Sequence, residues 1–428
     1  MGSRTAALVE VLRIRDFTLL WAAHLISVLG DWVLLSALLV FVYRLTGTKS
    51  DIGLMLIAEA LPIILFGYVA GALLDYWNRR KVMIAADLVR AGAVLLIMLV
   101  DSPARLWIVY LVAFITGTCS LVFRPARAAS IPKIVPERIL VSANSLSSLN
   151  ETVGMLIGPV IGGMLAMRYM KIVCLADAAT FLFSAAVIKA AVIPQDVGPV
   201  SLRTFADLKA EVAHGFRFIA GNRTLRSLFL VIGMGVLGLG AYNVLEVAFA
   251  TDELGLSGAQ FGMLLSSMAF GMLLGSLVTA VFGTRIRPPI MFTGALLGFG
   301  VALAAFSRAS GFVEAVAAVA LAGVGGAVMN VASITIFQLA TPNSLQGRIM
   351  MLFWIVYTAL TLGSMGIAGP AADWLGVRTV LFIVGVIAVG SGFLCISLLC
   401  RPDRVLAPVE GKESLEVAAV PDSTQGGD

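Results

Sequence analysis

Charged side chains are scarce in this chain. Only 13% of its 428 residues are charged, whereas 59% are hydrophobic. Soluble globular proteins carry about 25% charged residues, and a soluble fold would have no interior large enough for so much apolar surface. The composition therefore predicts an integral membrane protein.

The chain is also poor in the residues that bind metals or form disulfide frameworks. It contains two histidines and four cysteines, and the cysteines do not have the spacing of a metal site. The sequence shows no phosphate-binding loop and no catalytic triad. We therefore expect no metal, no cofactor, no direct use of ATP and no enzymatic activity.

Long apolar runs occupy most of the sequence. A helix needs about 20 apolar residues to cross a bilayer, and twelve runs are of this order. We therefore predict an all-α polytopic membrane protein with twelve transmembrane helices in two pseudo-symmetric six-helix bundles. The runs are 17–43, 52–74, 82–100, 105–123, 143–167, 171–193, 225–249, 260–282, 289–307, 312–337, 350–372 and 377–400.

A polar segment in the middle divides the twelve runs into two sets of six. We predict an N-terminal bundle over residues 1–193, a cytoplasmic linker over 194–224 and a C-terminal bundle over 225–400. The tail over 401–428 is rich in Glu, Asp, Pro, Gly and Ser, which is typical of disorder. Each bundle has a proline-led turn followed by a Gly-Pro helix, and such weak internal repeats are typical of secondary transporters.

The linker has the pattern of a helix that lies on a membrane surface. Apolar residues recur there at steps of three and four, with basic residues between them. They are Phe205, Leu208, Val212, Phe216 and Ile219.

The lysines and arginines predict the orientation of the chain. If the N-terminus is cytoplasmic, most of the 30 lysines and arginines fall in cytoplasmic segments, as the positive-inside rule requires. We therefore expect both termini in the cytoplasm, in a multi-pass protein of the inner or plasma membrane. This bias also accounts for the net charge of +5, so no nucleic-acid partner is expected.

Glycine and proline interrupt the fifth apolar run in a regular way. Gly154, Gly158 and Gly162 are four residues apart and share one helix face, where small side chains let two helices approach closely. Pro159 removes a backbone hydrogen bond and bends the helix. The stretch G-M-L-I-G-P-V-I-G-G, which ends at Gly163, resembles the antiporter motif G-x-x-x-G-P-x-x-G-G of the major facilitator superfamily. The resemblance implies export.

The loop between the second and third runs carries a second motif. The stretch G-A-L-L-D-Y-W-N-R-R-K resembles the cytoplasmic loop signature G-x-x-x-D-R-x-G-R-R of the same superfamily, with matches at Gly71, Asp75, Arg79 and Arg80. Tyr76 stands where the family has a basic residue. We expect Asp75 to meet a helix end or an arginine across the seam between the bundles and to hold one state of the transporter. Alternatively, the loop only anchors the topology.

Three further stretches are similar to one branch of the superfamily, which holds macrolide-efflux and enterobactin-exporter-like proteins. They are Arg15–Trp32, Phe123–Pro132 and Ala143–Leu146. The resemblance covers nearly the whole chain and implies alternating access of two bundles around a central substrate site.

Ionisable side chains inside spans are costly and suggest function. A carboxyl group that is removed from water holds a proton more readily, so Asp31, Glu59 and Glu246 are our candidates for proton coupling. Asp31 is the first choice because His24 and Ser27 lie on the same helix face. Each of these groups could instead only hold helices together.

Other polar residues suggest a substrate cavity. The candidates for its lining are His24, Tyr242, Asn243, Asn330, Trp354 and Thr358. Asp87 and Arg90, three residues apart on one helix, are expected to pair with each other in a structural role.

These observations predict a secondary transporter, expected to act as a monomer, that exports a small amphipathic organic compound such as a drug, a macrolide or a siderophore. The proton, or another cation, is the expected coupling ion, and the lipid bilayer is the expected surroundings. One alternative keeps the fold but imports a small metabolite. Another is a membrane receptor or scaffold that transports nothing, although the short acidic tail is a poor output domain.

The loop motif yields a first testable prediction. Replacing the loop carboxylate by the amide in Asp75→Asn should sharply reduce transport without loss of expression, because one conformational state loses an electrostatic contact. Cellular accumulation of substrate, normalised to the amount of protein in the membrane, measures the effect. Unchanged accumulation would show that the loop only anchors the topology.

Overall fold

The computed structural model describes residues 2–74, 77–166, 168–194, 215–283, 285–342 and 345–400. Every long element in these ranges is an α-helix, because lipid offers the backbone no hydrogen-bond partners. The first-half helices are α1 (Gly2–Arg13), α2 (Arg15–Thr46), α3 (Lys49–Leu74), α4 (Arg79–Leu96), α5 (Trp107–Ile134), α6 (Leu140–Leu165) and α7 (Met170–Ala190). The second-half helices are α9 (Arg223–Ala248), α10 (Gly258–Phe282), α11 (Pro288–Arg308), α12 (Phe312–Ala340), α13 (Gln346–Leu375) and α14 (Val377–Leu399).

Short helical segments join some of these helices. Three of them are 3-10 turns, and the fourth is a π-helical turn that continues α9. They are Ile97–Leu99, Pro103–Arg105, Glu137–Ile139 and Phe249–Glu253.

Eleven helices in the described ranges are long and apolar enough to cross a membrane. The predicted run 143–167 corresponds to α6, which has the length of a span but is not among these eleven. The first half of α6 carries serines, asparagines and Glu151, which explains its lower hydrophobicity. The all-α polytopic membrane fold predicted from the sequence is confirmed.

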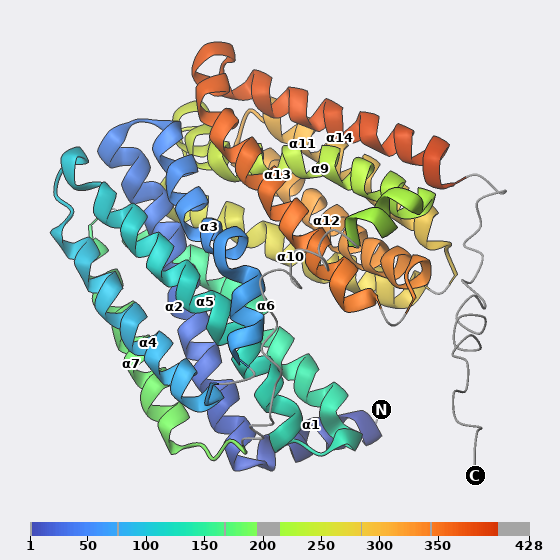
Figure 1. The fold of residues 1–428 in the computed structure, drawn as a ribbon. Helices are drawn as coiled ribbons and strands as arrows, with labels where there is room; N and C mark the ends of the chain where they lie inside the picture. Colours follow the sequence, from blue (N-terminus) through green and yellow to red (C-terminus); the bar gives the residue numbers. More distant parts are fainter. Residues whose placement is uncertain are drawn as a thin grey trace, which may run out of the picture.

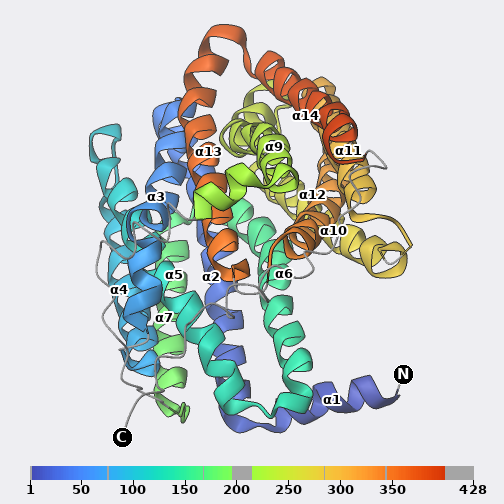
Figure 2. The same ribbon diagram turned by 45° about the vertical axis from the view of Figure 1, so that its right-hand side comes forward.

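The helices form two groups that are inclined to each other (Figures 1 and 2). In the first group α2 packs against α6 and α7, and α5 packs against α3 and α4. In the second group α9 packs against α13 and α14, while α12 packs against α10 and α11. Two helix pairs supply most of the contact between the groups, α6 with α10 and α3 with α13.

The segments around these groups are described only in part. Residues 195–214 of the predicted surface helix and the whole predicted tail, 401–428, lie outside the described residues. Residues 215–221 are helical, and Ile219 is buried beside Leu225. The helix α1 is not predicted by the apolar runs. It lies beside the start of α6 (Figure 2), where Glu10 pairs with Arg138.

Polar contacts between the two groups lie where α2 ends and α3 begins. The Tyr43 hydroxyl donates a hydrogen bond to Asp252, and the Lys49 ammonium group lies 2.8 Å from the Asp373 carboxylate. The largest buried apolar cluster is also shared by both groups at this end. We call it the contact end of the molecule.

The evenly spaced glycines of α6 face α2 in their own group. A Cβ atom at Gly154, Gly158 or Gly162 would come within 3 Å of α2 side chains, among them Trp32 and Ser36. Side chains at these three positions would therefore force α6 and α2 apart. The four-residue spacing thus builds a close contact inside the first group.

The rest of the motif faces the other group. A Cβ atom at Gly163 would overlap the carbonyl oxygen of Gly258, and one at Gly262 would overlap the carbonyl oxygen of Pro159. Residues 159 and 163 of α6 therefore lie backbone to backbone against α10. This part of the motif holds the groups together at the contact end.

The two faces of α6 predict different consequences for two equivalent substitutions. Gly163→Leu should push α6 away from α10 and separate the groups at the contact end. Gly158→Leu should disturb α6 against α2, destabilise the first group by about 1–3 kcal/mol and abolish transport. Both variants should still insert into the membrane.

Spin labels at Thr46 and Glu253, in a cysteine-free background, measure the separation of the groups. We expect the distance to increase by several Å in Gly163→Leu but not in Gly158→Leu. Equal distances in the two variants would contradict this assignment of the faces.

Candidate functional site

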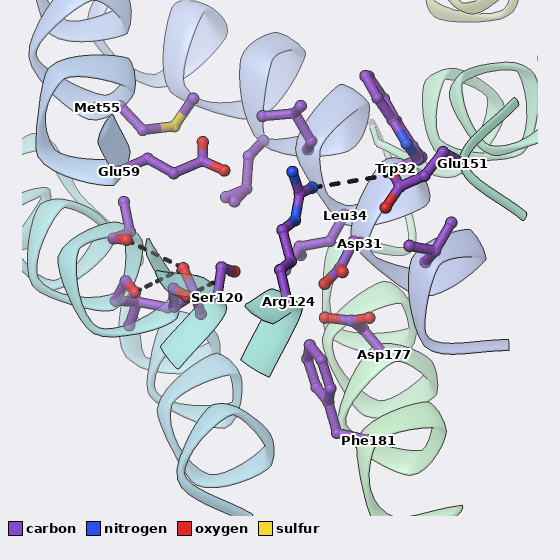
Figure 3. A pocket seen from close by; sticks show the side chains of 16 residues that line it. Asp31, Trp32, Leu34, Met55, Glu59, Ser120, Arg124, Glu151, Asp177 and Phe181 are labelled. Carbon is purple, nitrogen blue, oxygen red and sulfur yellow. Dashed lines mark hydrogen bonds and ion pairs between the residues drawn. The ribbon is translucent and has the colours of Figure 1, made fainter. Parts of the chain in front are cut away.

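An acidic cavity of about 280 Å³ lies among the helices of the first group (Figure 3). Four carboxyl groups line it, from Asp31, Glu59, Glu151 and Asp177, together with the guanidinium group of Arg124. These five residues come from five different helices, α2, α3, α6, α7 and α5. The tertiary fold, and no single sequence motif, therefore assembles this site.

Glycines place two of these carboxyl groups. A Cβ atom at Gly30 would overlap the carboxylate of Asp177 and lie 2.6 Å from the hydroxyl of Thr180. The missing side chain lets α7 approach α2, so that Asp31 and Asp177 face each other across the cavity (Figure 3). On the other side, a Cβ atom at Gly117 would overlap the backbone carbonyl oxygen of Glu59, so the backbone of α5 lies directly against that of α3 at this residue.

The carboxyl groups of the cavity differ in their partners. Arg124 lies 3.9 Å from Glu151, which also lies 3.5 Å from His24. Among the described residues, neither Asp31 nor Glu59 forms an ion pair. Asp177 is 2% exposed, and its Oδ2 atom has no hydrogen-bond partner in the described part of the chain. Three carboxyl groups therefore lack a cationic partner.

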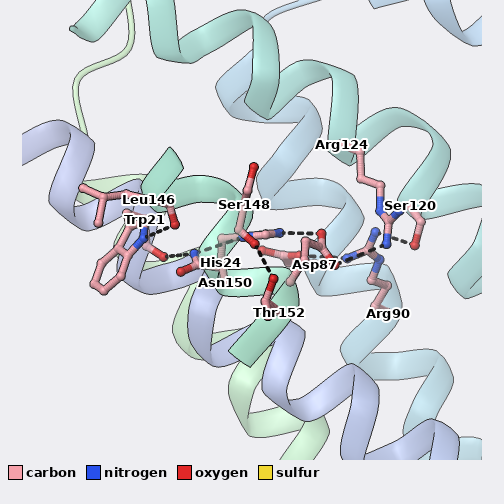
Figure 4. Close-up of polar contacts among 11 residues, drawn as sticks. Trp21, His24, Asp87, Arg90, Ser120, Arg124, Leu146, Ser148, Asn150 and Thr152 are labelled. Atoms are coloured by element: carbon pink, nitrogen blue, oxygen red, sulfur yellow. Dashed lines mark hydrogen bonds and ion pairs between the residues drawn. The ribbon is translucent and has the colours of Figure 1, made fainter. Parts of the chain in front are cut away.

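His24 belongs to a polar chain behind the cavity and is not part of the cavity lining (Figure 4). Its ring lies 3.1 Å from the amide nitrogen of Asn150, which donates a hydrogen bond of 2.9 Å to the carbonyl oxygen of Trp21. The Trp21 indole in turn donates to the carbonyl oxygen of Leu146. These polar contacts hold α2 against α6, and they reach the cavity at Glu151, which His24 contacts.

Asp87 and Arg90 form the expected ion pair, with 3.7 Å between the charged atoms. The Ser184 hydroxyl donates to Asp87 at 2.6 Å, and Arg90 donates to Ser120 at 3.0 Å. Both charged side chains are buried, and the guanidinium group also lies over the ring of Phe181. The predicted pairing is confirmed, and its structural role stays a prediction.

A second cavity, of about 340 Å³, is lined mainly by the second group. Three of the residues predicted for a substrate cavity lie here, namely Asn243, Asn330 and Trp354. Apart from Ser333, the remaining lining is apolar or aromatic and includes four methionines, so we call this the methionine cavity. The four are Met155, Met268, Met272 and Met329.

The remaining predicted side chains of the second group line neither cavity. Tyr242 and Glu246 are buried on α9, 2% and 4% exposed, and the Tyr242 ring packs 5.6 Å from that of Phe306. Thr358 is also buried and absent from both linings. Glu246 therefore lies apart from the carboxyl groups of the acidic cavity.

The loop motif is described only in part. Asp75 lies outside the described residues, and Gly71 is part of α3. Arg79 donates to the carbonyl oxygen of Ala129 on α5 at 3.1 Å, and Arg80 donates to that of Ile188 on α7 at 3.3 Å. These arginines join the start of α4 to its neighbours.

Sequence reasoning did not select Asp177, Glu151 or Arg124 as site residues. The sequence places a carboxyl group inside a span in the case of Asp177, but it contains no sign that α7 faces α2. The small residue Gly30 next to Asp31 is a signal for close helix packing, although it does not identify the neighbour.

Comparison with known proteins shows a family match and several relatives that cover most of this chain. The profile of the family described as transmembrane secretion effector matches residues 6–414. An MFS-type transporter from Bacillus subtilis (strain 168), YfiS, is 25% identical over 397 residues, which cover 88% of this chain and 91% of the relative. Macrolide efflux protein A from Streptococcus pyogenes is 24% identical, and the match covers 90% of this chain and 95% of the relative. Enterobactin exporter EntS from Escherichia coli O1:K1 / APEC is 26% identical, and the match covers 87% of this chain and 90% of the relative.

Solved structures show the same fold at low sequence identity. The nucleoside transporter NupG has a TM-score of 0.72 at 12% identity, covering 90% of this chain and 99% of that one. A bacterial homologue of the iron transporter ferroportin, in an inward-facing state, has a TM-score of 0.72 at 15% identity, covering 91% and 100%.

The buried Asp87–Arg90 pair yields a prediction for stability. Arg90→Met removes the partner of a buried carboxylate and should destabilise the fold by about 3–5 kcal/mol. The double variant Asp87→Asn/Arg90→Met removes both charges and should recover much of this loss. Melting temperatures of the purified proteins in detergent measure the effect, and an unchanged value for the single variant would contradict a structural role.

Proposed function

We infer that this chain, which belongs to the transmembrane secretion effector family of the major facilitator superfamily, exports a small amphipathic organic compound in exchange for protons. Membership of the family makes the protein a multi-pass transporter of small molecules and not an enzyme. Export, proton coupling and the nature of the compound are our proposal. Relatives whose names describe efflux and export support the direction.

The observation that carries the proposal is the set of unpaired carboxyl groups in the acidic cavity. Asp31 is half-buried and Glu59 is exposed, and both line the cavity. A carboxyl group that has no cationic partner can bind a proton or another cation to balance its charge. Protons bound here can therefore leave when another ligand enters, as antiport requires.

The arrangement of the groups supports alternating access. The close contacts between the groups lie at the end where α2 finishes. With both termini in the cytoplasm, as the basic residues predict, the contact end faces outward and the protein is in an inward-facing state. Substrate would then enter from the cytoplasm, and release would require the contact end to open.

Within this proposal the carboxyl groups do not have equal support. Asp31 and Glu59 share one cavity, whereas Glu246 is buried in the second group away from it. We therefore propose Asp31 as the principal proton carrier, with Glu59 beside it. Pro159 and Gly163 hold α6 against α10 and would limit leak at the contact end.

Substituting Asp31 by its amide tests the proposal. Asp31→Asn cannot titrate but keeps nearly the same shape, so it should lower export driven by a pH gradient by at least about tenfold while substrate still binds. Everted vesicles with an imposed pH gradient provide the measurement.

The surface variant Asp101→Asn is the matched control, because its carboxylate is exposed, pairs with Arg105 and accepts a hydrogen bond from Ser102, both nearby on the surface. It should export at the rate of the unmodified protein. The proposal fails if Asp31→Asn, Glu59→Gln and Glu246→Gln each retain full pH-driven export.

A further inference from the structure

The carboxyl groups that line the acidic cavity outnumber its cationic groups. Four carboxyl groups line it against the single guanidinium group of Arg124, which already pairs with Glu151. The neighbouring side chains Arg90 and His24 form no ion pair with the other three carboxyl groups in the described part of the chain. Arg90 is paired with Asp87 and does not line the cavity, and His24 contacts Glu151. Asp31, Glu59 and Asp177 therefore face the same space without a cation.

Asp177 is the residue of this cluster that indicates a ligand most directly. Its side chain is almost fully buried, yet it lines the cavity, and one carboxylate oxygen has no hydrogen-bond partner in the described ranges. The Asp31 and Asp177 carboxyl groups face each other in Figure 3. Two neighbouring carboxylates repel each other unless a proton or another positive charge lies between them.

Aromatic rings complete this side of the site. Trp32 and Phe181 line the same cavity as the carboxyl groups, and the Arg90 guanidinium group already lies over the Phe181 ring. The faces of aromatic rings attract cations, and the attraction is stronger where water is excluded. A positively charged group in this cavity would therefore meet carboxylates and the Trp32 ring, whereas an anion would meet repulsion from both.

The helix α6 contributes a side chain to each of the two cavities. Glu151 lines the acidic cavity and Met155, one helical turn later, lines the methionine cavity. The lining of the methionine cavity holds no charged residue and includes Trp354 and Tyr357. Methionine side chains adapt to ligands of different shape, so this cavity suits a bulky apolar or aromatic body.

We propose that the transported compound is an amphipathic organic cation that binds across both cavities. Its positive group lies among Asp31, Glu59 and Asp177, and its apolar body occupies the methionine cavity. This inference rests on the proposed function and adds the charge and shape of the substrate. It also explains exchange, because the cation and the protons compete for the same carboxyl groups.

Two ions of equal shape and opposite charge test the inference. Tetraphenylphosphonium and tetraphenylborate have nearly the same size and four phenyl rings each, so they differ mainly in the sign of their charge. We expect the purified full-length protein in detergent to bind the cation at least about tenfold more tightly than the anion. Titration calorimetry provides both affinities. Equal binding, tighter binding of the anion or no binding of the cation would overturn the inference.

Variants of the two cavities separate charge from shape. Asp177→Asn should weaken binding of the cation about tenfold and leave the anion unaffected or bound more tightly, with Glu59→Gln as a second variant if the first does not fold. Met272→Ala should weaken binding of both ions. The surface variant Asp101→Asn should change neither affinity. Unchanged binding of the cation to both folded carboxyl variants would contradict the site.

The binding assay needs no pH gradient and no direction of transport, so it separates this inference from the proposed function. Selective binding of the cation without pH-driven export would leave the inference standing and refute proton-coupled export. Export that depends on Asp31 but carries only neutral or anionic compounds would refute the inference and leave the proposed function standing.

Discussion

A carboxylate inside a helix bundle must find a positive charge, because the low dielectric of the interior and the surrounding lipid make an isolated negative charge costly. The first group of helices contains five such carboxyl groups. Asp87 is matched by Arg90, and Glu151 is matched by Arg124, with the His24 ring also close to it. The other three, in the acidic cavity, have no such partner among the described residues. Protons or a bound cation would supply the missing positive charge there.

Small residues determine where the charges lie. Gly30 lets α7 approach α2 and brings Asp177 to Asp31, and Gly117 lets α5 approach α3 beside Glu59. On α6, one set of glycines packs inside the first group, while residues 159 and 163 pack against α10 of the other group. The helix that carries Glu151 into the cavity is therefore also the helix that closes the contact end. A change of charge at the cavity and a movement between the groups involve the same element.

The sequence was sufficient for features that depend on one helix or on composition. The membrane class, the long apolar helices and the Asp87–Arg90 pair follow from apolar length and from spacing along a single helix. It was not sufficient where distant helices meet. No local pattern shows that Asp177 faces Asp31, or that the evenly spaced glycines face α2 and not α10. Glu246 could not be separated from the cavity residues either, because α9 is buried on most of its surface and its periodicity does not show which face lines a cavity.

Proton release on binding is the most direct test of the claim that cation and protons share the carboxyl groups of the acidic cavity. Tetraphenylphosphonium would be added to the purified protein in a weakly buffered solution that contains a pH indicator. The account predicts that binding acidifies the solution and that Asp31→Asn releases fewer protons per bound cation. Binding without proton release, at every pH at which the protein is folded, would contradict it.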